Sequence, residues 1–248
     1  MDEDGGGLIL LGRNAALEAI NHNKPVDRLL IKKGAEGTLK VIAAKARERG
    51  IVVQEASAQK LAELSMGGNH QGVIALCPAK EYAEPEDMLA CARERAEDPF
   101  IVILDEITDP HNLGAIIRCA EAAGAHGVVI PKRRAAGLTA TVAKASSGAI
   151  EHILISRVTN IGDSVDYFKS QGLWAVSAVT GGASVYETNL TGPVAVVIGS
   201  EGSGVKRLVC EKSDFTVGIP MRGRVGSLNA SVAAGVIFFE IIRQRSLK

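Results

Sequence analysis

The stretch IPMRGRVGSLNASVAAG, residues 219–235, joins two kinds of secondary structure through a glycine-containing loop. It continues the apolar run FTVGI (215–219), which is typical of a buried strand, and it leads into ASVAAGVIFFEII (230–242), which is typical of a helix. A strand, a glycine loop and a helix start often hold a small polar ligand. The spacing matches neither a Walker phosphate loop nor the G-x-G-x-x-G dinucleotide fingerprint. The identity of the ligand therefore depends on the rest of the chain.

The composition is that of an ordinary globular protein. Of 248 residues, 46% are hydrophobic and 23% are charged, which allows a buried core and argues against global disorder. The four cysteines lie far apart, and the acidic start MDEDGGG does not resemble a secretory signal, so we expect reduced intracellular thiols. The longest apolar run, VAAGVIFFEII, contains Glu240 and is too short to span a membrane. These features predict a soluble, cytoplasmic protein with no membrane partner.

The net charge of zero hides an uneven distribution. Residues 1–4 carry three acids, and residues 79–99 carry seven acids against three basic residues, which leaves 18 acidic and 25 basic residues in the rest of the chain. Nucleic-acid-binding proteins are usually basic. The charge therefore permits an RNA partner without requiring one.

Two α/β regions are expected, separated by an acidic linker. Residues 1–78 predict a small α/β unit, with helices at 12–21 and 38–50 and strands at 26–32, 51–56 and 72–77. Residues 79–99 contain prolines and many acids, and we interpret them as a linker with one short helix around Met88–Arg95. From residue 100 to residue 248, apolar strands alternate with helices. This pattern indicates a mostly parallel sheet with helices on both faces, whose ligands lie at the carboxyl ends of the strands.

The first polar loop follows the predicted strand at 100–106. In DEITDPHNLGAIIRCAEAAG (105–124), Asp109 and Pro110 signal a turn, and Asn112 is placed to cap the next helix. That structural role alone explains these three residues. Arg118 is harder to explain, because it lies in an otherwise apolar helix and arginine is rarely buried without a partner. It is a candidate to meet a phosphate or carboxylate near the strand ends.

Two further loops follow later strands. In VVIGSEGSGV (196–205), the glycines allow a ligand to approach the backbone closely and Glu201 is a lone acid, although a tight strand-to-helix turn would look the same. In the stretch at 219–235, Ser227 or Asn229 can cap the final helix, which explains part of the loop. Neither explanation gives a role to Arg222 and Arg224.

Together the three loops follow the order DPxNxGxxxR, GxEGxG and IPMxGxxxSLNxSVAAG. This order resembles the signature of the SpoU (TrmH) family of RNA ribose 2′-O-methyltransferases. The resemblance implies a SPOUT-type domain at 100–248 with a C-terminal trefoil knot, S-adenosylmethionine (AdoMet) as methyl donor, and a homodimer with active sites shared between subunits. The start LGRNAALEAI and the run NHQGVIAL (69–76) resemble the substrate-binding domain of that family, which is similar to the L30e-type fold. The whole arrangement is most similar to bacterial 23S rRNA guanosine 2′-O-methyltransferases.

The resemblance also implies the residues of the site. The catalytic group would be Asn112, Arg118, Glu201, Ser227 and Asn229, and the cofactor-binding group would be Thr180, Gly199, Ile219, Met221 and Leu228. No cluster has metal-ligand spacing, so no metal is predicted. A guanidinium stays charged, with a pKa above about 12, so we interpret Arg118 as a phosphate clamp that activates the hydroxyl electrostatically.

Surface charges and the final helix indicate where RNA and a second subunit would bind. Arg222, Arg224 and the run PKRR (131–134) are candidate RNA contacts, and the broad apolar surface of the final helix indicates burial in the core and a homodimer interface. Three alternatives stay open at this point. They are a tRNA methyltransferase, a non-catalytic RNA-binding protein of the same fold, and a nicotinamide or flavin oxidoreductase, which would lack its usual phosphate fingerprint here.

Overall fold

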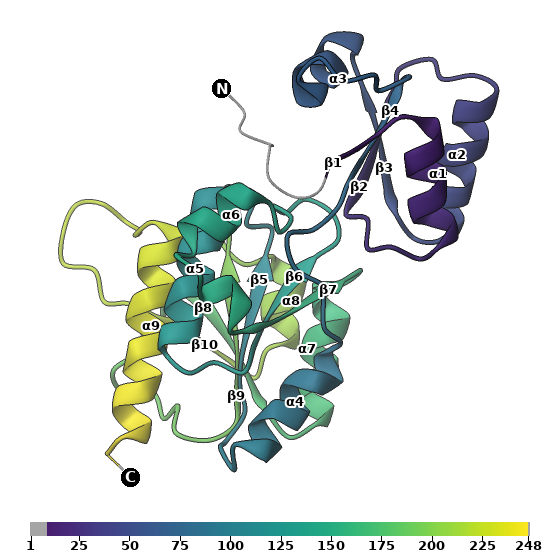
Figure 1. Cartoon of the computed structure of the whole chain (residues 1–248). Coiled ribbons are helices and arrows are strands. Elements are labelled where there is room, and N and C mark those ends of the chain that lie inside the picture. The colour runs from purple at the N-terminus through teal and green to yellow at the C-terminus, as the bar shows by residue number, and fades with distance from the viewer. Residues whose placement is uncertain (1–8, 248) are drawn as a thin grey trace. The chain divides into compact units, whose positions relative to one another are not determined.

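A computed structural model describes residues 9–247 and divides the chain into two compact units (Figure 1). The first unit contains the N-terminal part up to Glu81 together with Gly137–Thr141, and the second contains Tyr82–Ala136 and the chain from Val142 onward. The acidic start at 1–4 lies outside the described residues. The expected functional extents of 1–78, 79–99 and 100–248 stay predictions.

The first unit is a mixed sheet with helices on both faces. The strands β1 (Ile9–Leu11), β2 (Arg28–Lys32), β3 (Val52–Ala56) and β4 (Val73–Leu76) are ordered β1-β4-β2-β3. Only β2 and β3 are parallel among the paired strands of residues 9–81. Helices α1 (Arg13–Asn21) and α2 (Thr38–Glu48) pack on one face, and α3 (Ala58–Ser65) packs on the other. The predicted elements are confirmed, but β1 and α3 were missed.

The segment Gly137–Thr141 completes this unit from far along the chain. Leu138 is fully buried, and its carbonyl accepts a hydrogen bond from the Ala79 N–H at 2.7 Å. A Cβ atom on Gly137 would lie 2.6 Å from the Asp27 carboxylate, so a larger residue there would have to displace that side chain. The first unit therefore includes a segment distant in sequence.

The second unit has a parallel sheet of six strands ordered β10-β8-β9-β5-β6-β7. Its strands are β5 (Phe100–Asp105), β6 (Gly127–Pro131), β7 (Leu154–Val158), β8 (Trp174–Ser184), β9 (Val194–Gly199) and β10 (Phe215–Gly218). Every strand pair recorded in this sheet is parallel. The predicted fold class, an α/β protein with a mostly parallel sheet, is confirmed. The trefoil knot and the likeness of the first unit to an L30e-type fold stay predictions.

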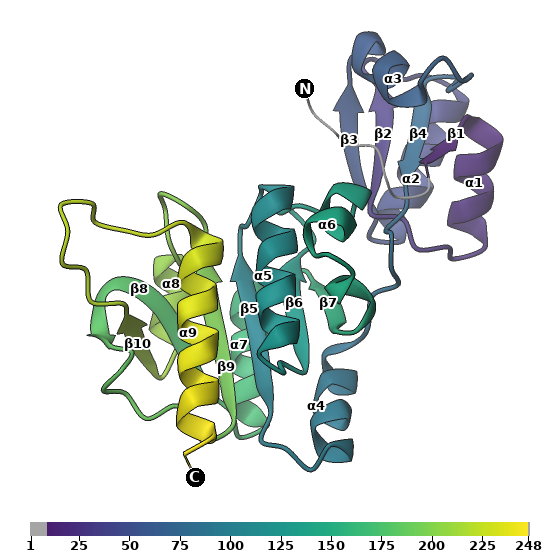
Figure 2. The ribbon, with the colours of Figure 1, turned by 60° about the vertical axis from the view of Figure 1, so that its left-hand side comes forward.

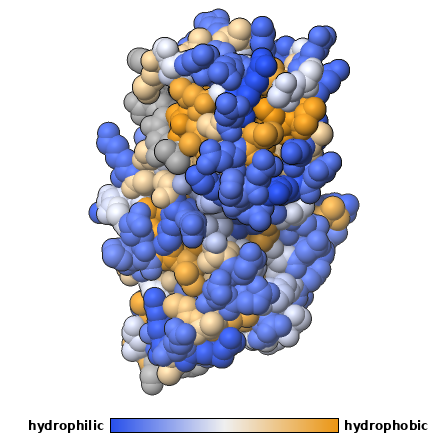
Figure 3. Space-filling view, turned by 45° about the vertical axis from the view of Figure 1, so that its right-hand side comes forward, coloured by the Kyte–Doolittle hydropathy of each residue, from blue (hydrophilic) through white to orange (hydrophobic). Residues whose placement is uncertain are grey.

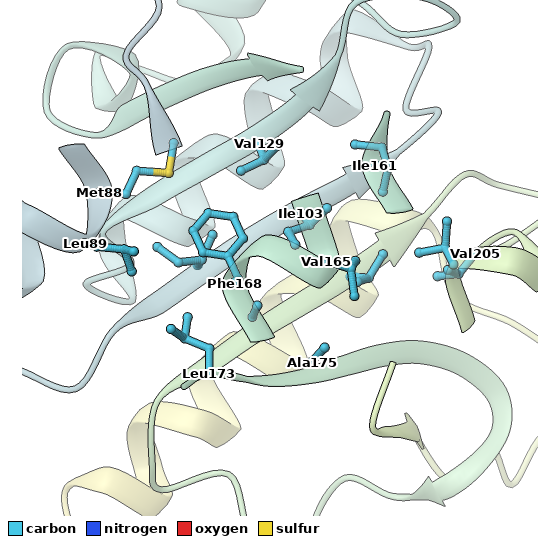
Figure 4. Packing of buried hydrophobic residues seen from close by; sticks show 14 residues of the cluster. Met88, Leu89, Ile103, Val129, Ile161, Val165, Phe168, Leu173, Ala175 and Val205 are labelled. Atoms are coloured by element: carbon cyan, nitrogen blue, oxygen red, sulfur yellow. The ribbon is translucent and has the colours of Figure 1, made fainter. Parts of the chain in front are cut away.

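Helices cover both faces of this sheet. On one face, α4 (Pro85–Glu94), α7 (Ile161–Ser170) and α8 (Arg207–Lys212) enclose a core around Phe168 (Figure 4). On the other face lie α5 (Pro110–Ala122), α6 (Ala140–Ala145) and α9 (Ala230–Arg245), which stand in front of the strands in Figure 2. Phe238 of α9 packs edge-on against Phe100 of β5, with ring centroids 5.6 Å apart. Successive residues of β5 point to opposite faces, so an all-apolar strand fills both cores.

The stretch interpreted as a linker contains a packed helix. Met88, Leu89 and Ala92 of α4 are buried, and Met88 lies directly over Gly127, where a Cβ atom would be 2.2 Å from the methionine sulfur. The acids of α4 occupy its exposed positions and its first turn, where Glu84 and Asp87 form a capping box. The short helix expected around Met88–Arg95 is therefore present, but it begins at Pro85 and packs as part of the second unit.

The surface is that of an ordinary folded protein. Hydrophilic residues dominate the face drawn in Figure 3, with smaller hydrophobic areas between them. Within residues 9–247, no helix is long and apolar enough to cross a membrane.

Candidate active site at the carboxyl ends of the strands

Three loops meet at one edge of the six-stranded sheet. β5 and β9 are neighbours, with Asp105 paired to Gly199, and β10 lies beyond β8 on the same side. Because these strands are parallel, their carboxyl ends share one edge. The three loops singled out in the sequence follow β5, β9 and β10, so the structure brings them together.

The first loop starts α5 differently from expectation. Asp109 is the N-cap residue, and its carboxylate accepts a hydrogen bond from the His111 N–H at 2.9 Å, while Pro110 occupies the first helical position. Asn112 therefore does not cap the helix, and this part of the sequence analysis was wrong. Asn112 lies inside the first turn, which leaves its amide free for contacts across the site.

Asn112, Glu201 and Asn229 form a cluster that ties the three loops together. The Asn112 amide donates to Glu201 Oε1 at 3.3 Å, and the Asn229 amide donates to Asn112 Oδ1 at 2.9 Å and also to Glu201 Oε1. Asn229 Oδ1 accepts from the N–H groups of Ser231 and Val232, which confirms Asn229 as the N-cap of α9. One residue from each loop thus contributes to a single hydrogen-bonded group.

The loop after β9 folds back on its own strand. Ser200 and Gly204 form an isolated bridge, and Gly202 and Gly204 have positive φ angles of 87° and 63°. A Cβ atom on Gly199 would lie 2.0 Å from the Gly204 carbonyl carbon. Side chains other than glycine are therefore excluded where this loop turns.

A cavity of about 900 Å³ lies between the loops after β9 and β10 and the end of β8, and Asn112 of the first loop is not part of its lining. It is lined by all the residues expected to bind the cofactor, namely Thr180, Gly199, Ile219, Met221 and Leu228. Glu201, Ser227 and Asn229 also line it. The volume is within the usual range for a small-molecule site, about 300–1,000 Å³. Much of the wall is glycine backbone, which suits a ligand recognised through peptide N–H and C=O groups.

The sequence analysis missed Gly218, which lines this cavity, and Gly182, which lies against β10. A Cβ atom on Gly218 would lie 2.8 Å from the Val179 carbonyl oxygen, and one on Gly182 would lie 2.6 Å from the Val217 carbonyl carbon. The end of β8 therefore passes β10 with backbone against backbone. The glycines in VTGGAS (179–184) and FTVGIP (215–220) were the available signal.

Arg118 lies apart from both the cavity and the cluster. It is exposed rather than buried in an apolar helix, and it is not among the residues that line the cavity. Its Nη1 donates to the hydroxyl of Ser147 at 3.1 Å. Ser147 has a positive φ of 50°, and its turn packs closely on α5 because Gly114 would place a Cβ atom 2.5 Å from that of Ala145. Within one chain, Arg118 is therefore oriented but does not reach the cavity.

Positive charge flanks the cavity. Arg222 and Arg224 lie in the exposed loop between β10 and α9. Neither side chain makes a hydrogen bond or an ion pair with another residue of the described part of the chain. The loop therefore offers two free guanidinium groups beside the site, which suits a polyanionic substrate.

Comparison with family models identifies this arrangement. Residues 99–239 match the model of the SpoU rRNA methylase family. The chain belongs to the SpoU family. Residues 9–83 of this SpoU protein match a second model, described as RNA 2′-O ribose methyltransferase substrate binding. The protein is thus an RNA 2′-O-ribose methyltransferase, and the first unit carries its substrate-binding region.

Relatives and solved structures agree with this assignment. A Bacillus subtilis (strain 168) protein, YacO, which bears the name of a TrmH family tRNA/rRNA methyltransferase, is 46% identical over 240 residues, 96% of each chain. AviRb from Streptomyces viridochromogenes, a SpoU methyltransferase solved with the cofactor AdoMet, is 26% identical, with a TM-score of 0.62 over 98% of this chain and 92% of its own. A TrmH/SpoU tRNA-modifying enzyme of A. aeolicus is 29% identical, with a TM-score of 0.55 over 65% of this chain and 84% of its own.

Proposed function

We propose that this SpoU protein transfers the methyl group of AdoMet to the ribose 2′-hydroxyl of a guanosine in 23S rRNA. The observation that carries the proposal is a glycine-rich cavity walled by two of the three polar loops, with the third loop joined to it through the hydrogen bonds of Asn112 to Glu201 and Asn229. AviRb, which binds AdoMet, matches 98% of the chain, including the substrate-binding region. The tRNA-modifying enzyme of A. aeolicus matches only 65% of the chain. A cytoplasmic location follows from the ribosomal substrate.

The cavity fits AdoMet. The backbone groups of Gly199, Ile219 and Leu228 would hold its adenosine and amino-acid ends, and Thr180 and Met221 would flank them. When bound, AdoMet supplies an electrophilic methyl group on a sulfonium centre. Glu201 is the acid of the lining, and its carboxylate is held by the amides of Asn112 and Asn229.

The polar residues would orient the ribose. Glu201 holds the amides of Asn112 and Asn229 in place, so these amides and the Ser227 hydroxyl can hydrogen-bond the sugar hydroxyls. A ribose hydroxyl is a poor nucleophile at neutral pH, so the site must stabilise the developing alkoxide. Arg118 would bind the phosphate next to the target ribose and lower the hydroxyl pKa through its positive charge. It would not take the proton itself, because a guanidinium stays charged.

A homodimer would bring Arg118 to a cavity. Val232 and Phe239 on the outer side of α9 are each 51% exposed, and α9 packs beside α5, which carries Arg118. We propose that a second copy of the chain covers this surface, and that Arg118 of one subunit completes the cavity of the other.

Co-expression of an Arg118→Ala chain with a Glu201→Ala chain tests this arrangement. Shared sites predict recovery of about a quarter of the wild-type activity, since half of the dimers would have one intact site. Sites confined to one chain predict no recovery.

The substrate is tested by transfer of labelled methyl from AdoMet to separated 23S, 16S and tRNA pools. The RNAs come from cells that lack their ribose methylations, so that target sites are free. We expect label in 23S RNA as an alkali-resistant 2′-O-methylated dinucleotide. Label in tRNA alone would favour the alternative that the A. aeolicus relative represents. AdoMet binding without transfer to any pool would favour a non-catalytic RNA-binding role.

A further inference from the structure

Asp105 is a buried acid that the proposed chemistry does not use. It is the last residue of β5 and only 2% exposed, and Glu240 is the other buried acid among the described residues of this unit. A carboxylate is rarely buried to this extent unless its charge is hydrogen-bonded. Its Oδ2 accepts a hydrogen bond from the backbone N–H of Lys206 at 2.8 Å.

Through this bond and its strand pairing, Asp105 contacts both ends of the loop after β9. Its backbone pairs with Gly199, where the loop begins, and its side chain holds Lys206, where the loop ends. Between these two points lie six residues, 200–205, and all of them line the cavity. They include Glu201, the acceptor that joins the other two loops. A single residue of β5 therefore fixes the start and the end of a loop that forms one wall of the site.

The start of α8 shows why an outside acceptor is needed. Lys206 is its N-cap residue and makes no side-chain capping bond, and its own N–H has no acceptor within the helix. Asp105 supplies an acceptor from a neighbouring strand. The Lys206 ammonium lies 2.7 Å from Glu106 and 4.0 Å from Asp105, but it is 48% exposed, so water weakens these ion pairs. The buried bond to the backbone N–H is the contact that holds the loop.

We propose that Asp105 is a positioning residue that holds the loop 200–205 in the conformation that binds AdoMet and presents Glu201. The proposal rests on the proposed function, because it assigns AdoMet to this cavity. Loss of the bond frees the loop end, and binding of AdoMet must then order it again. The effect appears first in the affinity for AdoMet, before any RNA is involved.

The experiment measures AdoMet affinity by isothermal titration calorimetry with the full chain. Asp105→Ala removes the acceptor, and we expect the Kd to rise by about tenfold or more, the usual worth of a hydrogen bond to a charged group. Asp105→Asn keeps an acceptor oxygen and should restore the Kd to within about threefold of wild type. Lys206→Pro removes the same bond from the donor side, and the Lys206 φ of −59° suits proline. It should weaken binding as much as Asp105→Ala, and the double variant should show no further loss.

Two control variants separate positioning from general stability. Lys206→Ala removes the ammonium but keeps the backbone N–H, so its Kd should stay at the wild-type value. Asp214→Ala breaks an equivalent 2.8 Å bond from a carboxylate to the Ala175 N–H, at the opposite edge of the sheet. It should lower the melting temperature without changing the AdoMet affinity.

Folded Asp105→Ala and Lys206→Pro proteins with wild-type Kd values would overturn the proposal. If Asp105→Ala does not fold, the Lys206→Pro result decides alone. A wild-type protein that does not bind AdoMet would instead refute the proposed function.

Discussion

Polar side chains at the two edges of the six-stranded sheet have different hydrogen-bond partners. At the amino ends of the strands, His126 accepts a hydrogen bond from the Phe100 N–H at 3.0 Å, and Arg245 donates to the carbonyls of Asp98, Pro99 and Gly192. At the carboxyl ends, Asn112, Glu201 and Asn229 bond mainly to one another, beside a cavity. The first group is tied to the backbone within the fold, whereas the second group is accessible.

The hydrogen-bond partner of a polar side chain therefore indicates whether that side chain stabilises the fold or serves the site. A buried side chain that satisfies backbone N–H or C=O groups stabilises the fold, because its removal leaves those groups without partners. Exposed side chains from distant loops that bond to each other gain little stability, so their arrangement has another purpose. Variants of the amino-edge side chains should therefore lower stability, and variants of Asn112, Glu201 and Asn229 should lower activity. Asp105 differs from these three because it is buried at the carboxyl edge and accepts from a backbone N–H.

The largest effect is expected at Arg118, which belongs to neither edge. Arg118→Ala should reduce methyl transfer by about 10²–10³-fold, the usual loss when one charge-stabilising group is removed, with AdoMet affinity unchanged. Single-turnover transfer and calorimetry measure the two quantities. Arg207→Ala, which removes an exposed arginine paired only with Glu211, is the matched control. Equal losses of transfer and AdoMet affinity would place Arg118 in the cofactor site instead.

At the amino edge, Arg245→Met should lower the free energy of unfolding by about 2–3 kcal/mol. It removes the donor of the Asp98 and Gly192 carbonyls, whereas the Pro99 carbonyl keeps the Val194 N–H, and it removes a cation over the Phe100 ring. Urea denaturation measures the change, with Arg207→Met as the control. The specific activity of the folded fraction should stay at the wild-type level. A large loss of activity at unchanged stability would contradict the structural role of Arg245.

At the carboxyl edge, Glu201→Ala should weaken AdoMet binding by about tenfold and reduce transfer at least as much, because two amides and the Ala230 N–H lose their shared acceptor. The melting temperature should hardly change, since Glu201 is exposed. Calorimetry and a thermal melt on the same preparation test both statements. The exposed Glu211→Ala variant provides the control, and a marked fall in melting temperature would contradict the assignment.

The smallest effect is a pH dependence caused by His126. Burial lowers the pKa of His126 in the folded protein, although Glu97 beside it acts in the opposite direction. The folded state thus binds a proton less readily than the unfolded chain, whose histidine has a pKa near about 6.5. Stability should be full above that pH and fall as the pH drops below it, by at most about 1.4 kcal/mol per pH unit. Urea denaturation between pH 7.5 and pH 5.5 measures the slope, which His126→Gln should reduce.

Much of the fold could be predicted because each parallel strand is an unbroken apolar run. FIVILD and VAVVIG could only be strands covered on both faces, and their polar ends indicated the edge that holds the site. Asn229 was also predictable as an N-cap, because the helix after it is long and apolar. Local patterns of this kind depend on near neighbours alone.

The remaining features depend on contacts between distant residues. Acids on the exposed side of α4 hid the buried Met88 and Leu89, and the exposed position of Arg118 was not visible in a helix of apolar letters. Asp105 looked like the end of a strand until Lys206 was found beside it. No sequence spacing encodes a contact across about a hundred residues, so these roles needed the fold.

The segment Gly137–Thr141 limits how this protein can exchange parts with its relatives. The substrate-binding unit is not one continuous piece of sequence, because the buried Leu138 and its neighbours in Gly137–Thr141 belong to it from beyond β6. A chimera that swaps only residues 1–81 would keep a foreign side chain in that place and lose the fit around Ala79 and Asp27. Recombination between family members should therefore transfer the two segments together. A graft that alters the RNA specificity of such an enzyme must accordingly exchange both segments.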